Sequence, residues 1–391
     1  MDSFLEFRGC GKRKNRETTF EEPPSKKRKF NIKDIVNDGK TLLELCQNEE
    51  WDYIEYSISR KIKDWNFESR DVEGNTPLLI CARKGALSTI KAFHSVLPPF
   101  VITEHNLQTG STMLLESCKS GNIDLVEWLL EQKSDIKVYN NLGNTCILLA
   151  ALHGHFELVK WLSANGCSLN TLNRNGESCF LCACRSGNLE MIEWCLNNGS
   201  ILSQSNNARN NCALLAASEG HIKVLKWLLE QVNLKKSKAE SEFLPVYNPL
   251  TEKNAAGDTC ILLAIEKGHL EIIKWLVEIG HSLEESNNDR DGCITIASAK
   301  GHLEIVKWLV EQGCSLQEMN TKGTCIMNAA HNSHIDTVIW MLFNGSTLDE
   351  NTALDNGEII KEVKSCEEIL KEQRIYEEVK KPFTSKSSRK A

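Results

Sequence analysis

The chain has 391 residues, of which 41% are hydrophobic and 25% are charged, and its formal net charge is −7. These proportions are typical of a folded protein, and the negative charge argues against a uniformly basic nucleic-acid binder. No run approaches the roughly 20 apolar residues of a membrane span, and residues 1–31 lack the apolar core of a signal peptide. We therefore expect an intracellular protein with no membrane partner, whose 16 cysteines are reduced thiols.

The N-terminal segment, residues 1–33, is basic, with ten Lys or Arg against five Asp or Glu. This composition predicts disorder. Two prolines in the segment precede a run that resembles a nuclear import signal: Lys26, Lys27, Arg28 and Lys29. We therefore predict an import receptor as one partner and the nucleus as a location, with the cytoplasm as an alternative. A solvated tail or a nonspecific polyanion contact would have the same residues.

Residues 34–71 are a weak copy of the pattern that follows them. The stretch from Thr41 to Ile58 keeps the apolar spacing of two short helices but lacks the recurring marker residues. We interpret it as a degenerate repeat that covers the front of a stack, because a terminal repeat needs one face shielded.

Three residue types recur at a common spacing through residues 72–348. Trp128 and Trp161 lie 33 residues apart, whereas Trp227 and Trp275 lie 48 apart. The tryptophan column is Trp128, Trp161, Trp194, Trp227, Trp275, Trp308 and Trp340; the cysteine column is Cys146, Cys179, Cys212, Cys260, Cys293 and Cys325; the glycine column is Gly121, Gly154, Gly187, Gly220, Gly268 and Gly301. Three columns with one period indicate a single supersecondary unit copied along the chain.

Each copy is predicted to fold as two short helices. In one copy an apolar run starts at Cys146 and stops at Gly154, a residue type that ends helices in the left-handed conformation, and a second run covers Phe156 to Leu162. The residue before the cysteine column is of a type favoured at helix N-caps in every copy: Thr76, Thr112, Thr145, Ser178, Asn211, Thr259, Gly292 and Thr324. Such short helices are unstable alone, so neighbouring copies must pack together.

The copies resemble a known repeat. Thr76-Pro77-Leu78-Leu79, followed by Lys84-Gly85, is similar to the ankyrin repeat, whose signature starts Thr-Pro-Leu-His and continues to Gly-His. Later copies place Cys where Pro is usual and lack the signature His. The resemblance implies an all-α solenoid of helix-turn-helix units, with about eight clear repeats over residues 72–348.

Two segments depart from the period. Residues 233–254 contain the extra residues of the 48-residue step, and we predict an exposed insertion loop there. Residues 349–391 follow the last repeat. Between Asn356 and Lys381 their apolar residues recur at helical spacing, which predicts a C-terminal capping helix followed by a loose tail.

The columns also invite chemical interpretations. A thiol at a helix start is reactive in some proteins, but helices about 8–10 Å apart keep column neighbours beyond disulfide distance. Buried apolar thiols are therefore the favoured interpretation, also for the denser group Cys179, Cys182, Cys184 and Cys195, which we do not expect to bind a metal. The recurring histidines His155, His221, His269 and His302 are expected to be structural hydrogen-bonding residues. For the tryptophan column we favour packing between helices over a ligand-binding stripe.

No catalytic constellation, phosphate-binding loop or cofactor motif stands out, so we expect neither enzyme activity nor a cofactor or metal. The favoured function is a scaffold or adaptor that binds a protein partner. The resemblance places the binding surface at the loop tips and the first helices, and the candidate residues are Tyr139, Asn141, Asn173, Arg174, Asn207, Arg209, Asn288, Arg290 and Lys322. These tips are amide-rich, which suits hydrogen bonds to a partner backbone. Alternatives are a nuclear regulator whose basic segment contacts nucleic acid, although nucleic acid is the less favoured partner, and a substrate adaptor of a ubiquitin ligase.

Overall fold

The apolar run that follows each predicted N-cap forms a helix, which we call the first helix of a pair. The computed structural model describes residues 41–61, 65–97, 104–238 and 247–346. The first helices are α2 (Leu42–Gln47), α4 (Pro77–Arg83), α6 (Met113–Ser120), α8 (Cys146–Leu152), α10 (Cys179–Ser186), α12 (Cys212–Ser218), α14 (Cys260–Lys267), α16 (Cys293–Ala299) and α18 (Cys325–His331).

All eight predicted N-cap positions are confirmed. The side chain of Ser178, for example, accepts a hydrogen bond from the amide of Leu181, and Asn211 does the same for Leu214. Thr145 and Thr259 also occupy the N-cap but form no side-chain capping bond. The backbone turn at these starts is therefore common to the repeats, whereas the capping hydrogen bond is not.

A second helix follows each first helix after a short turn. These helices are α3 (Trp51–Ser59), α5 (Leu87–Val96), α7 (Ile123–Glu131), α9 (Phe156–Ala164), α11 (Leu189–Asn197), α13 (Ile222–Lys238), α15 (Leu270–Glu278), α17 (Leu303–Glu311) and α19 (Ile335–Phe343). The turn contains the glycine column. Gly121 and Gly187 have φ of +72° and +73° and cap α6 and α10 in the left-handed conformation.

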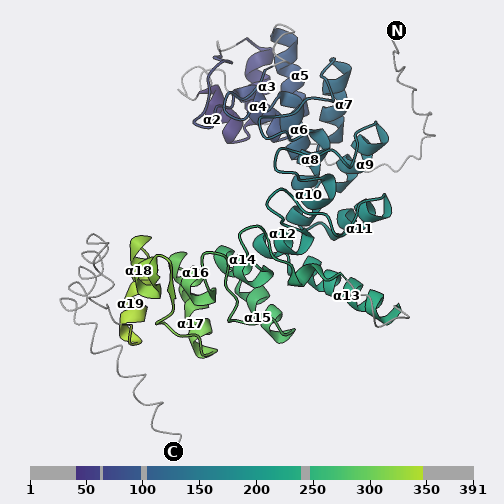
Figure 1. Ribbon diagram of the computed structural model, residues 1–391. Coiled ribbons are helices and arrows are strands. Elements are labelled where there is room, and N and C mark those ends of the chain that lie inside the picture. Colours follow the sequence, from purple (N-terminus) through teal and green to yellow (C-terminus); the bar gives the residue numbers. More distant parts are fainter. Residues whose placement is uncertain (1–40, 62–64, 98–103, 239–246, 347–391) are drawn as a thin grey trace, which may run out of the picture.

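The helix pairs stack in chain order from α2 to α19, which lie at opposite ends of a bent row (Figure 1). The first helices are nearly surrounded, so that in α8 every residue from Cys146 to Ala151 is buried. The second helices bury one stripe, as Leu158, Val159 and Leu162 do in α9. Since each core lies between neighbouring pairs, the predicted all-α helix-turn-helix solenoid is confirmed. Within the described residues, none of the helices has both the length and the apolar composition to cross a membrane.

From α4 onward, a hairpin leads into each first helix. The last one contains β1 (Met319–Asn320) and β2 (Gly323–Thr324), paired antiparallel, and single bridges such as Tyr139 with Thr145 mark the same hairpin elsewhere. We call the turns of these hairpins the hairpin tips: residues 71–75, 106–111, 140–144, 173–177, 206–210, 254–258, 287–291 and 320–323.

The predicted insertion loop, residues 233–254, is partly helical. Helix α13 continues to Lys238 because buried Val232 extends its apolar stripe one turn beyond Leu228. The segment ends in the 3-10 helix η2 (Pro249–Thr251), where Pro249 and Leu250 are buried and the Pro249 carbonyl accepts a 3.0 Å hydrogen bond from Asn211. Part of this segment therefore packs on the stack instead of forming a loop.

The predicted ends of the stack differ in what the structure describes. The degenerate repeat, residues 34–71, contains the pair α2 and α3, and Thr41 and Glu44 cap α2 by exchanging hydrogen bonds of 2.8 and 3.2 Å. The basic segment 1–33 and the capping helix and tail predicted for residues 349–391 lie outside the described residues.

Candidate partner-binding surface

Each hairpin tip starts with an Asn or Asp whose side chain fixes the turn. In the tip 140–144, Asn140 Oδ1 accepts hydrogen bonds of 3.0 Å from the amides of Leu142 and Asn144. The next position, Gly143, has φ of +75° and donates its amide to the Asn140 carbonyl at 2.8 Å. This is a turn closed by its own asparagine, and it explains why asparagine recurs in the sequence.

The same asparagines link successive tips. Asn173 Nδ2 donates to Asn144 Oδ1 at 2.9 Å, and Asn287 Nδ2 donates to Asp258 Oδ1 at 3.0 Å. Asn173 is only 8% exposed, so its amide is not available to a partner. This candidate residue belongs to an amide ladder that holds the tips at a fixed spacing.

A second set of asparagines, at the exposed second position of three tips, also joins neighbouring tips. The amide groups of Asn141, Asn207 and Asn288 donate to the carbonyls of Gln108, Arg174 and Ala255 in the preceding tips, at 2.9, 2.9 and 3.0 Å. These three candidates are exposed, but their side-chain donors already hold the stack together. The expected hydrogen bonding of amides to a partner backbone would have to break these bonds.

The remaining five candidates are exposed on or directly before the tips, and their side chains form no such bond between repeats among the described residues. Their positions in the chain are Tyr139, Arg174, Arg209, Arg290 and Lys322. The Tyr139 ring is 64% exposed. The structure thus separates the predicted surface into asparagines that join the repeats and an aromatic or basic group that faces solvent.

Sequence reasoning missed a row of exposed apolar side chains on or directly before the first four tips. Val72 is 96% exposed and Leu107 is 65% exposed, and Leu142 and Leu172 lie next to the tip asparagines of the following two repeats. Successive tips are neighbours, because the Asn141 amide donates to the Thr109 carbonyl and the Arg174 amide to the Leu142 carbonyl. Val72 and Leu107 are second in their tips, Leu142 is third, and Leu172 precedes its tip, so no single column of the repeat pattern marks these residues.

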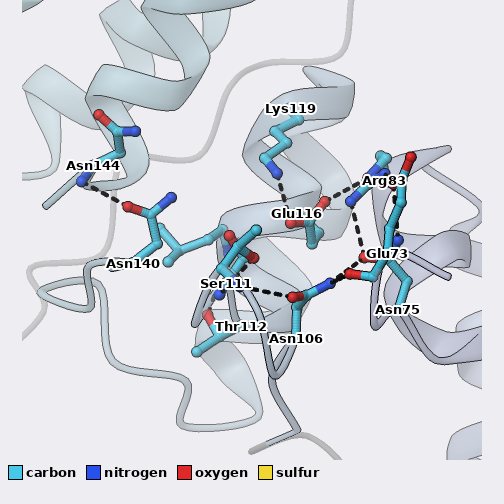
Figure 2. A network of polar contacts seen from close by, with 12 residues as sticks. Glu73, Asn75, Arg83, Asn106, Ser111, Thr112, Glu116, Lys119, Asn140 and Asn144 are labelled. Carbon is cyan, nitrogen blue, oxygen red and sulfur yellow. Dashed lines mark hydrogen bonds and ion pairs between the residues drawn. The ribbon is translucent and has the colours of Figure 1, made fainter. Parts of the chain in front are cut away.

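A buried polar network lies beside these tips on the first helices (Figure 2). Glu116 of α6 is fully buried and accepts hydrogen bonds from Arg83 Nε at 2.7 Å and Lys119 Nζ at 2.6 Å. Arg83 also contacts Asn75, whose side-chain oxygen accepts a 2.7 Å bond from Asn106. Since each charged group in this network has an opposite partner, it joins the repeats instead of offering a free charge.

The cysteine column is buried at the first residue of α8, α10, α12, α14, α16 and α18, as expected. The described cysteines are free thiols. Cys179, Cys182, Cys184 and Cys195 are all buried, and the described residues contain no group of three or more His, Cys, Asp or Glu arranged to hold a metal ion.

The histidine column has the predicted structural role. His155 Nε2 lies 2.7 Å from the Lys119 carbonyl of the preceding repeat, and His302 Nε2 lies 3.0 Å from that of Glu266. Two repeats have asparagine at this position instead of histidine. Asn122 and Asn188 donate to the carbonyls of Gly85 and Gly154, the glycines at the column position of the repeats before them. These side chains therefore connect each repeat to the one before it.

The tryptophan column is half-buried along the second helices. Trp194 contacts Phe156 of the preceding repeat edge to face, with 5.9 Å between ring centroids, and Trp128 contacts His94 in the same way at 5.3 Å. These contacts favour packing between adjacent second helices over a ligand-binding stripe.

The repeat pattern, the stacked helix pairs and the hairpins agree with a comparison against protein families. A family model of three ankyrin repeats matches residues 42–140, 94–173, 147–239, 242–320 and 261–352. The chain belongs to the ankyrin-repeat family. A comparison with curated proteins gives no match. Ankyrin repeats are generally protein–protein interaction modules, and stacks of this kind offer extended binding surfaces.

Proposed function

We propose that this protein is a non-enzymatic scaffold or adaptor that binds a protein partner through its hairpin tips and the adjoining first helices. The observation that carries the proposal is the apolar row Val72, Leu107, Leu142 and Leu172, on or directly before four neighbouring tips. Single exposed apolar residues are common on any protein. A row of them on a rigid edge is a feature of protein interaction sites.

The other exposed groups support a protein partner for the same edge. Aromatic and arginine side chains are enriched at protein interfaces, and Tyr139 and Arg174 stand beside the apolar row. The neutralised network around Glu116 lies beside the first two of these tips, so this part of the edge has a rigid support that changes little on binding.

Affinity capture with the full chain tests this proposal. The immobilised wild-type protein and a Leu107→Ser/Leu142→Ser variant are incubated with the same cell extract, and the captured proteins are quantified by mass spectrometry. Ile335→Ser is the matched control, because Ile335 is 55% exposed but lies on α19, away from the tips. We expect partners that the wild type and the control retain and the tip variant loses. Equal capture by the tip variant would contradict the proposal.

We also propose that the basic run Lys26, Lys27, Arg28 and Lys29 directs the protein to the nucleus. This run lies outside the described residues, and its support is the sequence pattern alone. Replacement of the four residues by alanine in a fluorescent full-length fusion should move the signal from the nucleus to the cytoplasm. An unchanged distribution would contradict import. A steeply salt-dependent DNA affinity that disappears in the same variant would instead support nucleic-acid contact.

A further inference from the structure

Two hairpin tips carry arginine where the other tips carry glycine. The residue that follows the turn has a left-handed backbone in each tip, and six tips have glycine there: Gly74, Gly110, Gly143, Gly176, Gly257 and Gly323. The tips 206–210 and 287–291 have Arg209 and Arg290 instead, at φ of +60° and +62°. Both donate their amides to the carbonyl of the first asparagine of the tip, as Gly143, Gly176 and Gly257 do, so the turn is the same.

This placement is unfavourable for the stack. A residue with a Cβ atom is strained in the left-handed region, and Asn or Asp is tolerated there better than arginine. Lys133 shows that a side chain is accepted at such an angle in a turn between repeats, with φ of +70°. The tips with Arg209 and Arg290 differ from the turn at Lys133 in a second way, because they also lack a contact between repeats that other tips have.

The lost contact is the asparagine that joins neighbouring tips. A Cβ atom at Gly110 or Gly257 would lie 2.5 Å from the Oδ1 atom of Asn141 or Asn288 in the next tip, so only glycine fits. The tip after Arg209 has Ala255 in the place of that asparagine, and the tip after Arg290 has Thr321. Both arginines thus occur where the joining amide is absent and a side chain has room.

The two guanidinium groups face solvent. Arg209 and Arg290 are exposed, and among the described residues neither has an ion pair with a carboxylate, although Asp289 and Asp291 flank Arg290 in the sequence. The tip between them, residues 254–258, presents only the small side chains of Ala255 and Ala256 at its exposed turn. A chain that contacts both arginines could therefore pass over this tip.

We propose that Arg209 and Arg290 together bind an acidic, extended segment of a protein partner, through two carboxylate or phosphate groups. The inference rests on the proposed function and names the chemistry of its partner. Two repeats at about 8–10 Å each separate the arginines by about 16–20 Å. An extended chain advances about 3.3 Å per residue, so the two anionic residues should lie about five or six positions apart. Arginine suits both anions because its planar group donates two parallel hydrogen bonds.

Nucleic acid is the less favoured source of the anions. The chain has a net charge of −7, and exposed acidic residues such as Glu252 and Asp289 lie near the same edge. A phosphate backbone would meet these charges along its whole length, whereas a peptide with two spaced anions would meet fewer of them.

Fluorescence anisotropy with the full chain tests the inference. The probes are labelled glycine–serine peptides with two glutamates placed three, six or ten positions apart, the same peptides with phosphoserine, and a twelve-nucleotide single strand of DNA. The variants are Arg209→Gly/Arg290→Gly, which keeps the turn, and Lys133→Gly, which removes an exposed cation at a left-handed position outside the hairpin tips.

We expect the six-position peptides to bind tightest and the double glycine variant to weaken them at least tenfold. The melting temperature of the double glycine variant should equal or exceed that of the wild type, since glycine relieves the strained backbone angles. Lys133→Gly should leave binding unchanged. Equal binding by the double glycine variant, an equal loss in Lys133→Gly, no dependence on spacing, or arginine-dependent DNA binding that exceeds peptide binding would each overturn the inference.

The capture experiment separates this inference from the proposed function. If the Leu107→Ser/Leu142→Ser variant loses its partners while the double glycine variant retains them, and no acidic peptide binds, the proposed function stands and the inference is overturned. If neither variant changes capture, the tips are not the binding surface and both are wrong.

Discussion

The buried carboxylate of Glu116 and the guanidinium of Arg83 join two consecutive repeats. Arg83 Nε donates to Glu116 Oε2 at 2.7 Å, and the Glu116 side chain is fully buried while that of Arg83 is 33% exposed. The bridge recurs further along the stack, where Arg185 contacts Glu177 of its own hairpin at 2.6 Å and Glu219 of the next repeat at 3.0 Å. An arginine at the end of a first helix thus fastens a hairpin and the following repeat together.

Replacement of Glu116 by alanine should lower the free energy of unfolding by about 2–3 kcal/mol, because charged hydrogen bonds are lost in a buried place. A double-mutant cycle with Arg83→Ala, measured by urea denaturation, gives the coupling energy of the pair. The control cycle uses Lys84 and Glu49, which also join two repeats at 2.8 Å but are 43% and 53% exposed. That pair should couple by less than about 1 kcal/mol. Equal coupling energies in the two cycles would show that the burial of Glu116 does not strengthen its ion pair.

Sequence reasoning predicted the fold well because its signals are local. The N-cap residue and the glycine that bound each first helix lie within about two turns of each other, so the period alone locates the helices. The network around Glu116 could not be predicted in this way. Its position is the fourth residue of α6, which corresponds to Ile80 in α4 and Leu149 in α8, and its partner Arg83 comes from the preceding repeat.

The sequence alone did not distinguish the two roles that asparagine has in the tips. Asn173 and Asn141 are the same residue type in equivalent turns of two repeats, yet Asn173 closes its own turn and Asn141 reaches back to the preceding tip. Neither role is visible without the neighbouring tip. The helical extension of α13 was missed for a related reason, because the charged residues after Val232 hid an apolar stripe that continues by only one residue.

The histidine column predicts different results for two substitutions at His302. His302→Ala removes the contact of its ring with the Glu266 carbonyl and should lower stability by about 1 kcal/mol. His302→Asn should be neutral or stabilising, because Asn188 at the same place both donates to the preceding Gly154 carbonyl and caps α11. Urea denaturation of both variants measures the difference. Equal destabilisation by alanine and asparagine would contradict the proposed role of this position.

The cysteine column predicts that proline is tolerated at position 260. Pro77 occupies the equivalent first position of α4, and Thr259 has the extended backbone (φ −100°, ψ 172°) that a residue before proline prefers. Cys260→Ser should cost about 1–3 kcal/mol by burying a hydroxyl. Cys179→Pro is the comparison, since the Cys179 amide donates to the Leu169 carbonyl at 3.3 Å and proline removes that donor. Calorimetry should therefore show a lower melting temperature for Cys179→Pro than for Cys260→Pro.

Thiol labelling should follow burial along the stack. Burial raises the pKa of the half-buried Cys167 and Cys314 to about 11, and that of the buried Cys182 to about 12. At pH 8 a thiol with a pKa of 11 is ionised in about one molecule in a thousand, so alkylation is slow and should accelerate about tenfold per pH unit up to pH 10. Cys182 also lacks access and should stay unmodified until the protein unfolds. Site-resolved mass spectrometry after brief iodoacetamide treatment measures the labelling of the half-buried thiols and of Cys182 separately. Rapid labelling of Cys182 at pH 8 would show that its repeat opens in the native state.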